Sequence, residues 1–233
     1  MGPLRTVDVA RESGYSVQQV RDLERLGVIP PAARSANGYR SYTPVHVHAL
    51  RAYRGLAGAV GPVEARELLA RVRTEPLVEA ASAISAVHVR LAREREEVLR
   101  AQEALRAIRR EAGNGEPEAG SDAMTITELA AALGVRPSTL RFWEQEGLVA
   151  PERVTSLRAR RYGVTAIRAA RVVAALRGSG YGIAAVREIT GSLDRLDGLE
   201  ETGLLLRRRL DRIADRTVAL LRAGADLAAI CGR

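Results

Sequence analysis

With 233 residues, of which 46% are hydrophobic and 3% aromatic, the chain is long enough for two domains whose cores are built from Leu, Val, Ile and Ala. All 36 basic residues are Arg, and with 28 acidic residues they give a net charge of +8. This charge fits a nucleic-acid partner better than an acidic substrate, and the alternative is an ordinary cationic surface. The chain has a single cysteine, which excludes an intramolecular disulfide and a multi-cysteine metal site. Its N-terminus has no apolar export signal, and no run of about 18 apolar residues occurs, so export and a membrane span are excluded. We therefore expect a cytoplasmic protein.

The first part of the chain, residues 1–76, begins with a predicted pair of short helices. VARESGYSV ends the first helix at Gly14, and Ser16 with Gln19 has the spacing of a capping box at the start of the second, which contains QVRDLERLGVIPP. Two short helices around a glycine turn on a basic chain are typical of a helix-turn-helix. An irregular, Arg-containing stretch and more helix follow.

Residues 77–112 are predicted to form one long helix. Apolar residues recur every seven positions, with charged residues between them, which is coiled-coil spacing. The heptad positions are Ile84, Leu91, Val98 and Leu105. Because a solitary helix of this kind would leave its apolar stripe in water, it needs a partner. The next stretch, 113–123, reads GNGEPEAGSDA and is predicted to be a linker, since it contains no large apolar residue.

The same order of elements returns in residues 124–193. Thr125 with Glu128 has capping-box spacing, Gly134 ends the first short helix, and Pro137 stands at the first position of the second. TLRFWEQEGLVAP aligns without a gap with QVRDLERLGVIPP, 120 residues earlier.

A second long helix is predicted in residues 194–233. Its heptad positions are Leu199, Leu206, Ile213, Leu220 and Leu227. The chain therefore contains the same arrangement of elements twice: a helix-turn-helix followed by a long coiled-coil helix.

The second half contains LAAALGV, TLRFWEQEGL, Pro151 and ARRY at 159–162, and the first contains VARESGY, QVRDLERLGVIPP and NGYRSY at 37–42. With these motifs at these spacings, each half resembles a MerR-family winged helix-turn-helix regulator, and the resemblance covers nearly the whole chain. The resemblance implies a mainly α-helical fold with two winged helix-turn-helix domains, each followed by a long helix. The first half departs from the family pattern at Asp22 and Leu23, where the family has aromatics, and the second has lost the Gly-Tyr of the wing.

The resemblance also implies that the second helix of each pair reads DNA and that each wing contacts the backbone. Near the start of such a helix, Gln18 and Gln19 suit adenine and Arg136 suits guanine, so the half-sites need not be identical. Arg21 and Arg141 resemble the family's phosphate-contacting arginine, the alternative being an ion pair with a nearby Glu on a solvated helix face. Aromatic members of the set are expected to pack in the core as well. The predicted DNA-binding residues are Ser16, Gln18, Gln19, Arg21, Arg34, Tyr39, Arg40, Tyr42, Arg136, Ser138, Thr139, Arg141, Trp143, Arg158, Arg160, Arg161 and Tyr162.

MerR-family proteins, as the resemblance implies, act as homodimers joined by an antiparallel coiled coil of their last long helices. Because this chain carries two such protomers, we expect its two long helices to pair antiparallel within one chain, as a monomeric pseudo-dimer. A homodimer with four DNA-binding units is the alternative.

The same resemblance implies that the chain is a sequence-specific transcriptional regulator. It would bind double-stranded promoter DNA and distort it so that RNA polymerase can engage both promoter elements. The sequence contains no phosphate loop and no recognisable nucleophile-base or carboxylate constellation, so we expect neither catalytic residues nor a cofactor. Three scattered histidines and a lone cysteine predict no metal site. Two alternatives stay open: a helical protein that sequesters a small molecule or a partner, and a coiled-coil scaffold.

Overall fold

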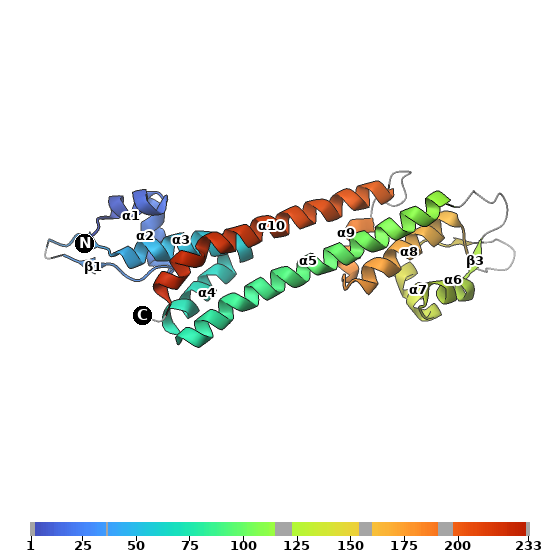
Figure 1. Cartoon of the computed structure of the whole chain (residues 1–233), viewed down its shortest axis with the longest axis horizontal. Helices are drawn as coiled ribbons and strands as arrows, with labels where there is room; N and C mark the ends of the chain where they lie inside the picture. The colour runs from blue at the N-terminus through green and yellow to red at the C-terminus, as the bar shows by residue number, and fades with distance from the viewer. Residues whose placement is uncertain (1–2, 36, 115–122, 154–159, 191–197, 232–233) are drawn as a thin grey trace. The chain divides into compact units, whose positions relative to one another are not determined.

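The computed structural model describes residues 3–35, 37–114, 123–153, 160–190 and 198–231, and it is mainly helical (Figure 1). The chain divides into two compact units. Unit 1 consists of Met1–Arg93 with Arg212–Arg233, and unit 2 of Glu94–Asp211.

Unit 1 opens with the expected pair of short helices, α1 (Thr6–Ser13) and α2 (Val17–Arg25). Gly14 ends α1 in the left-handed conformation with a φ of 69°, which explains why glycine stands there. The Ser16 side chain accepts from the Gln19 backbone N–H, while the Gln19 side chain accepts from the Ser16 N–H. The predicted capping box is therefore confirmed.

A two-stranded wing follows the helix pair in unit 1. Strand β1 (Ala33–Arg34) pairs antiparallel with β2 (Arg40–Ser41), and Tyr42 makes an isolated bridge with Leu4. The chain then enters α3 (Pro44–Val60), which packs on α1, and α4 (Pro62–Thr74), which packs on α3.

Unit 2 repeats this order with one more strand. Its elements are β3 (Met124–Thr125), α6 (Ile126–Leu133), α7 (Pro137–Gln145), β4 (Glu152–Arg153), β5 (Arg160–Tyr162), α8 (Val164–Gly178) and α9 (Ile183–Thr190). Strand β5 lies between β3 and β4, antiparallel to both. The capping box of Thr125 and Glu128, the left-handed Gly134 and Pro137 at the start of α7 are all as predicted.

The two long helices are α5 (Leu77–Asn114) and α10 (Gly198–Ile230). Most of their predicted heptad residues are buried: Leu91, Val98, Leu105, Leu206, Ile213, Leu220 and Leu227. Ile84 is half-buried against the core of unit 1, and the side chain of Leu199 lies outside the described residues.

In unit 1 the C-terminal part of α10 completes the core, beside α3 (Figure 1). Its residues Leu220, Ala223, Leu227 and Ile230 belong to the same cluster as Val87 and Leu91 of α5 and much of α3. Polar contacts accompany this packing: His48 Nδ1 lies 2.8 Å from an Asp226 carboxylate oxygen, and Arg216 Nε donates to the Ala59 carbonyl at 2.7 Å.

In unit 2 the N-terminal part of α10 meets the C-terminal part of α5 and α8. Leu105 and Leu206 line a small apolar hollow with Val172 and Leu176 of α8. At the surface, Arg109 of α5 pairs with Glu200 of α10.

These units differ from the division into consecutive domains that the sequence suggests. Each long helix contributes one part to unit 1 and another to unit 2, because its apolar stripe is buried in both. The proposed linker lies mostly in 115–122, outside the described residues. Among the described helices, none is long and apolar enough to cross a membrane.

Candidate nucleic-acid interface

The second helix of each pair buries one face and exposes the other. In α2, Val20 is fully buried, and Leu140 takes the corresponding place in α7. Arg21 and Arg141 follow directly and are exposed. Neither guanidinium makes a hydrogen bond or an ion pair with another described residue, so the intramolecular ion pair considered as an alternative is not formed in this structure.

A network of polar side chains occupies the exposed face of α2. The Gln18 amide nitrogen donates to both carboxylate oxygens of Asp22 at 3.2 Å, and Arg25 donates to the same carboxylate at 2.9 Å. The Gln19 side chain uses its amide oxygen in the capping box, and the Gln18 side chain uses its amide nitrogen on Asp22. Each of these two exposed glutamines therefore has the other end of its amide left for contact with a ligand.

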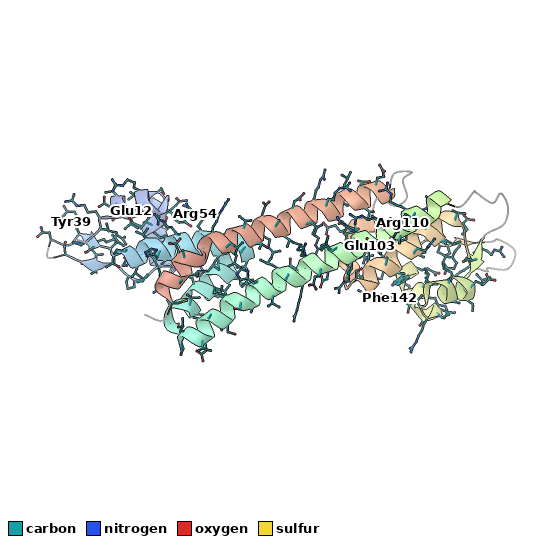
Figure 2. All side chains as sticks on the ribbon, in the orientation of Figure 1. Glu12, Tyr39, Arg54, Glu103, Arg110 and Phe142 are labelled. Atoms are coloured by element: carbon teal, nitrogen blue, oxygen red, sulfur yellow. The ribbon has the colours of Figure 1, made fainter. Side chains whose placement is uncertain are left out.

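The exposed face of α7 has a different chemistry. Arg136 and Ser138 are exposed near its start, Thr139 is half-buried, and Phe142 projects from the helix with 43% of its surface exposed (Figure 2). Phe142 stands where α2 has Asp22. The two helices thus present an apolar and an acidic side chain at matching positions.

In unit 1, a partly buried carboxylate fastens the wing to α2. Glu24 accepts hydrogen bonds from Arg40 Nε at 2.8 Å, from the Tyr42 hydroxyl at 2.9 Å and from the Ala32 backbone N–H at 3.0 Å. Burial raises the pKa of Glu24, but the hydrogen bonds from Ala32 and Tyr42 and the Arg40 charge outweigh it, so the pKa lies below its usual value. Burial, followed by the bond to Glu24, raises the pKa of Tyr42.

Unit 2 builds the same clamp 120 residues later. Glu144 of α7 accepts from Arg160 Nε at 2.9 Å and from the Tyr162 hydroxyl. Burial and then the bond to Glu144 raise the pKa of Tyr162, which keeps this hydroxyl protonated and donating. In both units the wing is therefore tied to the exposed helix by a charge-assisted contact.

The wings themselves expose cationic and aromatic side chains. Tyr39, at the outer tip of the β1–β2 hairpin, is 76% exposed (Figure 2), and the exposed Arg34 donates to the Gly38 carbonyl at 3.2 Å. In unit 2 Arg160 is exposed and Arg161 half-buried, while Arg158 lies outside the described residues.

Three aromatic residues of the predicted set lie in the core under this surface. Tyr42 and Tyr162 have no exposed surface, and Trp143 is 2% exposed. Their rings support the wing and the exposed helix in this structure. These aromatic side chains pack in the core, as expected from the sequence. A ligand can contact them only after a conformational change that exposes them.

Glu24 and Glu144 are not among the predicted DNA-binding residues. The sequence nevertheless carries a signal for their role, because Glu24, Arg40 and Tyr42 recur as Glu144, Arg160 and Tyr162 at a constant offset of 120. Within the described ranges, no group of three or more His, Cys, Asp or Glu side chains is placed to hold a metal ion.

Comparison with known proteins identifies this arrangement. Residues 124–193 match the family described as "MerR HTH family regulatory protein", and residues 5–42 match "MerR family regulatory protein". Heavy metal-dependent transcription regulator 2 of Rhizobium meliloti is 33% identical over 125 residues, which cover 53% of this chain and 84% of that protein. The chain belongs to the MerR family.

Two other MerR-type relatives extend the comparison. The HTH-type transcriptional regulator HmrR of Sinorhizobium medicae is 32% identical over 129 residues, covering 54% of this chain and 86% of HmrR. The regulator CueR of Salmonella typhi is 42% identical over 43 residues, so the chain spans only 31% of CueR's length and the match covers 18% of the chain. No solved structure is significantly similar to the chain.

Proposed function

We propose that the chain is a DNA-binding transcriptional regulator whose two MerR-type units read two non-identical half-sites of a promoter. The observation that carries this proposal is the repeated surface: in each unit an exposed arginine, Arg21 or Arg141, has no hydrogen-bond or ion-pair partner among the described residues and lies on a helix that the same Glu-Arg-Tyr contact ties to the wing. Membership of the MerR family and the names of the relatives, which are transcription regulators, support it.

Charge and position favour contact with the DNA backbone. Exposed guanidiniums on a chain of net charge +8 can neutralise phosphates and release counterions. Wing residues Arg34, Tyr39 and Arg160 can reach the flanking backbone, while the clamped β-hairpin holds them at a fixed place relative to the helix. Phosphate contacts of this kind position a protein, and base contacts from the helix supply its specificity.

The regulator also distorts its promoter in this proposal, so that RNA polymerase engages both promoter elements. Bending a site of this size costs on the order of 1–6 kcal/mol, which several arginine-phosphate contacts can offset. The resemblance to the MerR family motivates this step and the polymerase as partner.

We further propose that one chain holds both half-site readers, as a pseudo-dimer. Within each unit, part of α10 packs with part of α5, which supports pairing inside one chain. Analytical ultracentrifugation over a wide concentration range tests this. We expect a species of 25.1 kDa at all concentrations, and a stable species of twice that mass would establish the homodimer instead.

DNA binding is tested with duplexes from the gene's own upstream region in a salt titration. Arg21→Ala and Arg141→Ala should each weaken binding and lower the salt slope by about 0.9, the value for one lost phosphate contact. Arg95→Ala, an exposed arginine of α5, is the control and should leave the slope unchanged. Absence of binding by the wild-type protein at low salt would refute the regulator and leave the sequestering protein or the scaffold.

A further inference from the structure

Aromatic side chains are scarce in this chain, and two of them are exposed at the candidate interface. The sequence has one Trp, six Tyr and one Phe. Among the described residues, the exposed aromatics are Tyr39 at the wing tip and Phe142 on α7 (Figure 2). Tyr39 carries a hydroxyl that can hydrogen-bond to phosphate, whereas the Phe142 ring has no polar atom. With 43% of its surface in water, this ring gains free energy from any apolar partner that covers it.

Phe142 lies on the face of α7 that points away from the core. The same helix packs inward through Leu140 and Trp143, which are 0% and 2% exposed. Ser138 is exposed and precedes Phe142 by four residues, so the two side chains lie on one face of the helix, one turn apart. Arg141, the proposed phosphate contact, is the adjacent residue. In a helix-turn-helix, the residues near the start of the second helix are the ones that reach base edges.

The matching position of α2 has the opposite chemistry. Asp22 stands there, and its carboxylate accepts hydrogen bonds from Gln18 at 3.2 Å and from Arg25 at 2.9 Å. This part of α2 is therefore a polar, internally hydrogen-bonded surface. An apolar partner that suits Phe142 has no counterpart in unit 1.

The base edges of the major groove include one purely apolar group. Guanine, adenine and cytosine present only hydrogen-bond donors and acceptors there, whereas thymine adds its C5-methyl group. A phenylalanine ring placed against an amino group or a carbonyl oxygen would take that polar group out of water without a hydrogen bond, which is unfavourable. Against the thymine methyl, both partners are apolar and their contact is favourable.

We propose that Phe142 makes α7 a reader of the thymine methyl group, in one half-site only, because Asp22 occupies the matching position of α2. This inference rests on the proposed DNA-binding function and names a base that the second reader prefers. Cytosine methylated at C5 carries the same group at the same place in the groove, so α7 accepts it as well.

Replacing thymine with uracil tests the proposal, because it removes the methyl group and keeps the base pair. Selection from a randomised duplex library with the full-length wild type first defines the site, and each of its thymines is then replaced singly. We expect one position at which uracil weakens binding about fourfold, measured by fluorescence anisotropy. Phe142→Ala should bind the thymine and uracil duplexes at that position within about 1.5-fold of each other, since the partner of the methyl group is gone.

A methylated cytosine provides the converse measurement. In a duplex with a C·G pair at the same position, 5-methylation of the cytosine should strengthen binding of the wild type about fourfold and leave Phe142→Ala unaffected. The control Leu221→Ala removes an apolar side chain of α10 that is 63% exposed, and it should respond to uracil as the wild type does. Phe142→Ala should also keep the wild-type salt slope, because it loses no phosphate contact.

The possible outcomes separate this inference from the function on which it rests. If uracil weakens the wild type and Phe142→Ala equally, another residue reads the methyl group and the inference is wrong. If uracil has no effect at any position although Phe142→Ala binds less tightly, the ring contacts the sugar and the inference is also wrong. If no sequence is enriched and the wild type does not bind DNA at low salt, the proposed function itself fails.

The variants need a check of folding, because part of the Phe142 ring is buried. Circular dichroism at the assay temperature should give the same helical signal for Phe142→Ala as for the wild type. Phe142→Gln, which keeps a long side chain without an apolar ring, repeats the comparison. The effect of uracil on the wild type requires no variant, so its absence overturns the proposal in every case.

Discussion

Glu24 and Glu144 each hold a wing in place through contacts that span 16 and 18 residues of sequence. The side chain of each is only 12% exposed, so its contact with the arginine is screened little by solvent. A buried charge of this kind is stabilising only while all its partners are present, because an unpaired charge in the same place would be costly. One carboxylate in each unit therefore helps to hold the wing, together with the backbone pairing of Leu4 with Tyr42 in unit 1 and of β3 with β5 in unit 2.

Substitution of Glu24 tests the clamp. Glu24→Gln removes the charge and turns an NH2 group toward donors, so we expect the free energy of unfolding to fall by about 2 kcal/mol. Urea unfolding followed by circular dichroism measures it. The control Glu67→Gln, at an exposed position, should change stability by less than about 0.5 kcal/mol.

The effect should depend on pH, because the pKa of Glu24 is lowered by folding. Its stabilisation is complete above the usual carboxyl pKa of 4.5 and is lost as the pH falls through the lower pKa of the folded state. The difference in stability between the wild type and Glu24→Gln should therefore shrink at acidic pH. A difference that persists unchanged to about pH 2 would contradict the clamp.

At the scale of elements, glycine on α3 lets α10 approach closely in unit 1. A Cβ placed on Gly55 would lie 2.5 Å from Ala223 Cβ and 2.8 Å from the Ala219 carbonyl oxygen. Both neighbours belong to a helix, and neither is the flexible end of a side chain. The corresponding residue of α8 in unit 2 is Ala175, which lines the apolar hollow together with Leu105 and Leu206.

A single methyl group at Gly55 tests this contact. Gly55→Ala should destabilise unit 1 by about 1–3 kcal/mol, because the helices must move apart to accommodate it. Gly224→Ala, in the same region of α10 but with no atom near its Cβ, should instead stabilise by up to about 1 kcal/mol, since alanine favours helix. Thermal unfolding compares the two, and equal changes would show that the contact is not close.

At the scale of the whole molecule, unit 1 is assembled from both ends of the chain. The core that contains Val9 and Leu50 also contains Leu220 and Ile230. Residues that lie more than 150 positions apart in sequence thus share one apolar cluster, and the Arg216 guanidinium also donates to the Ala59 carbonyl from a position 157 residues later. The N-terminal helix-turn-helix accordingly depends on the last helix for its stability.

Removal of residues 212–233 tests this dependence. The deletion exposes the apolar side chains of α3 and α5 that Leu220, Leu227 and Ile230 cover. We expect amide hydrogen exchange in α3 to accelerate at least about 100-fold, whereas exchange in α8 of unit 2 changes little. Unchanged protection of α3 would show that unit 1 does not need α10.

The sequence alone determined the features that depend on near neighbours. Helix boundaries are of this kind, because the residues that form them lie within four positions of one another and can be recognised from the sequence. Examples are the capping boxes at Ser16 and Thr125, the left-handed Gly14 and Gly134, and the helical start at Pro137. The internal repeat likewise indicated two helix-turn-helix units, and the heptads indicated which side chains of the long helices are buried.

Contacts between residues far apart in the sequence become visible in the folded structure. The fold placed Glu24 against Arg40 and Tyr42, and it packed Ala223 of α10 against Gly55 of α3. An apolar stripe specifies that it must be covered, and a charge that it must be solvated or paired, but neither names its partner. Many partners satisfy these local requirements, and the packing of the complete chain selects one.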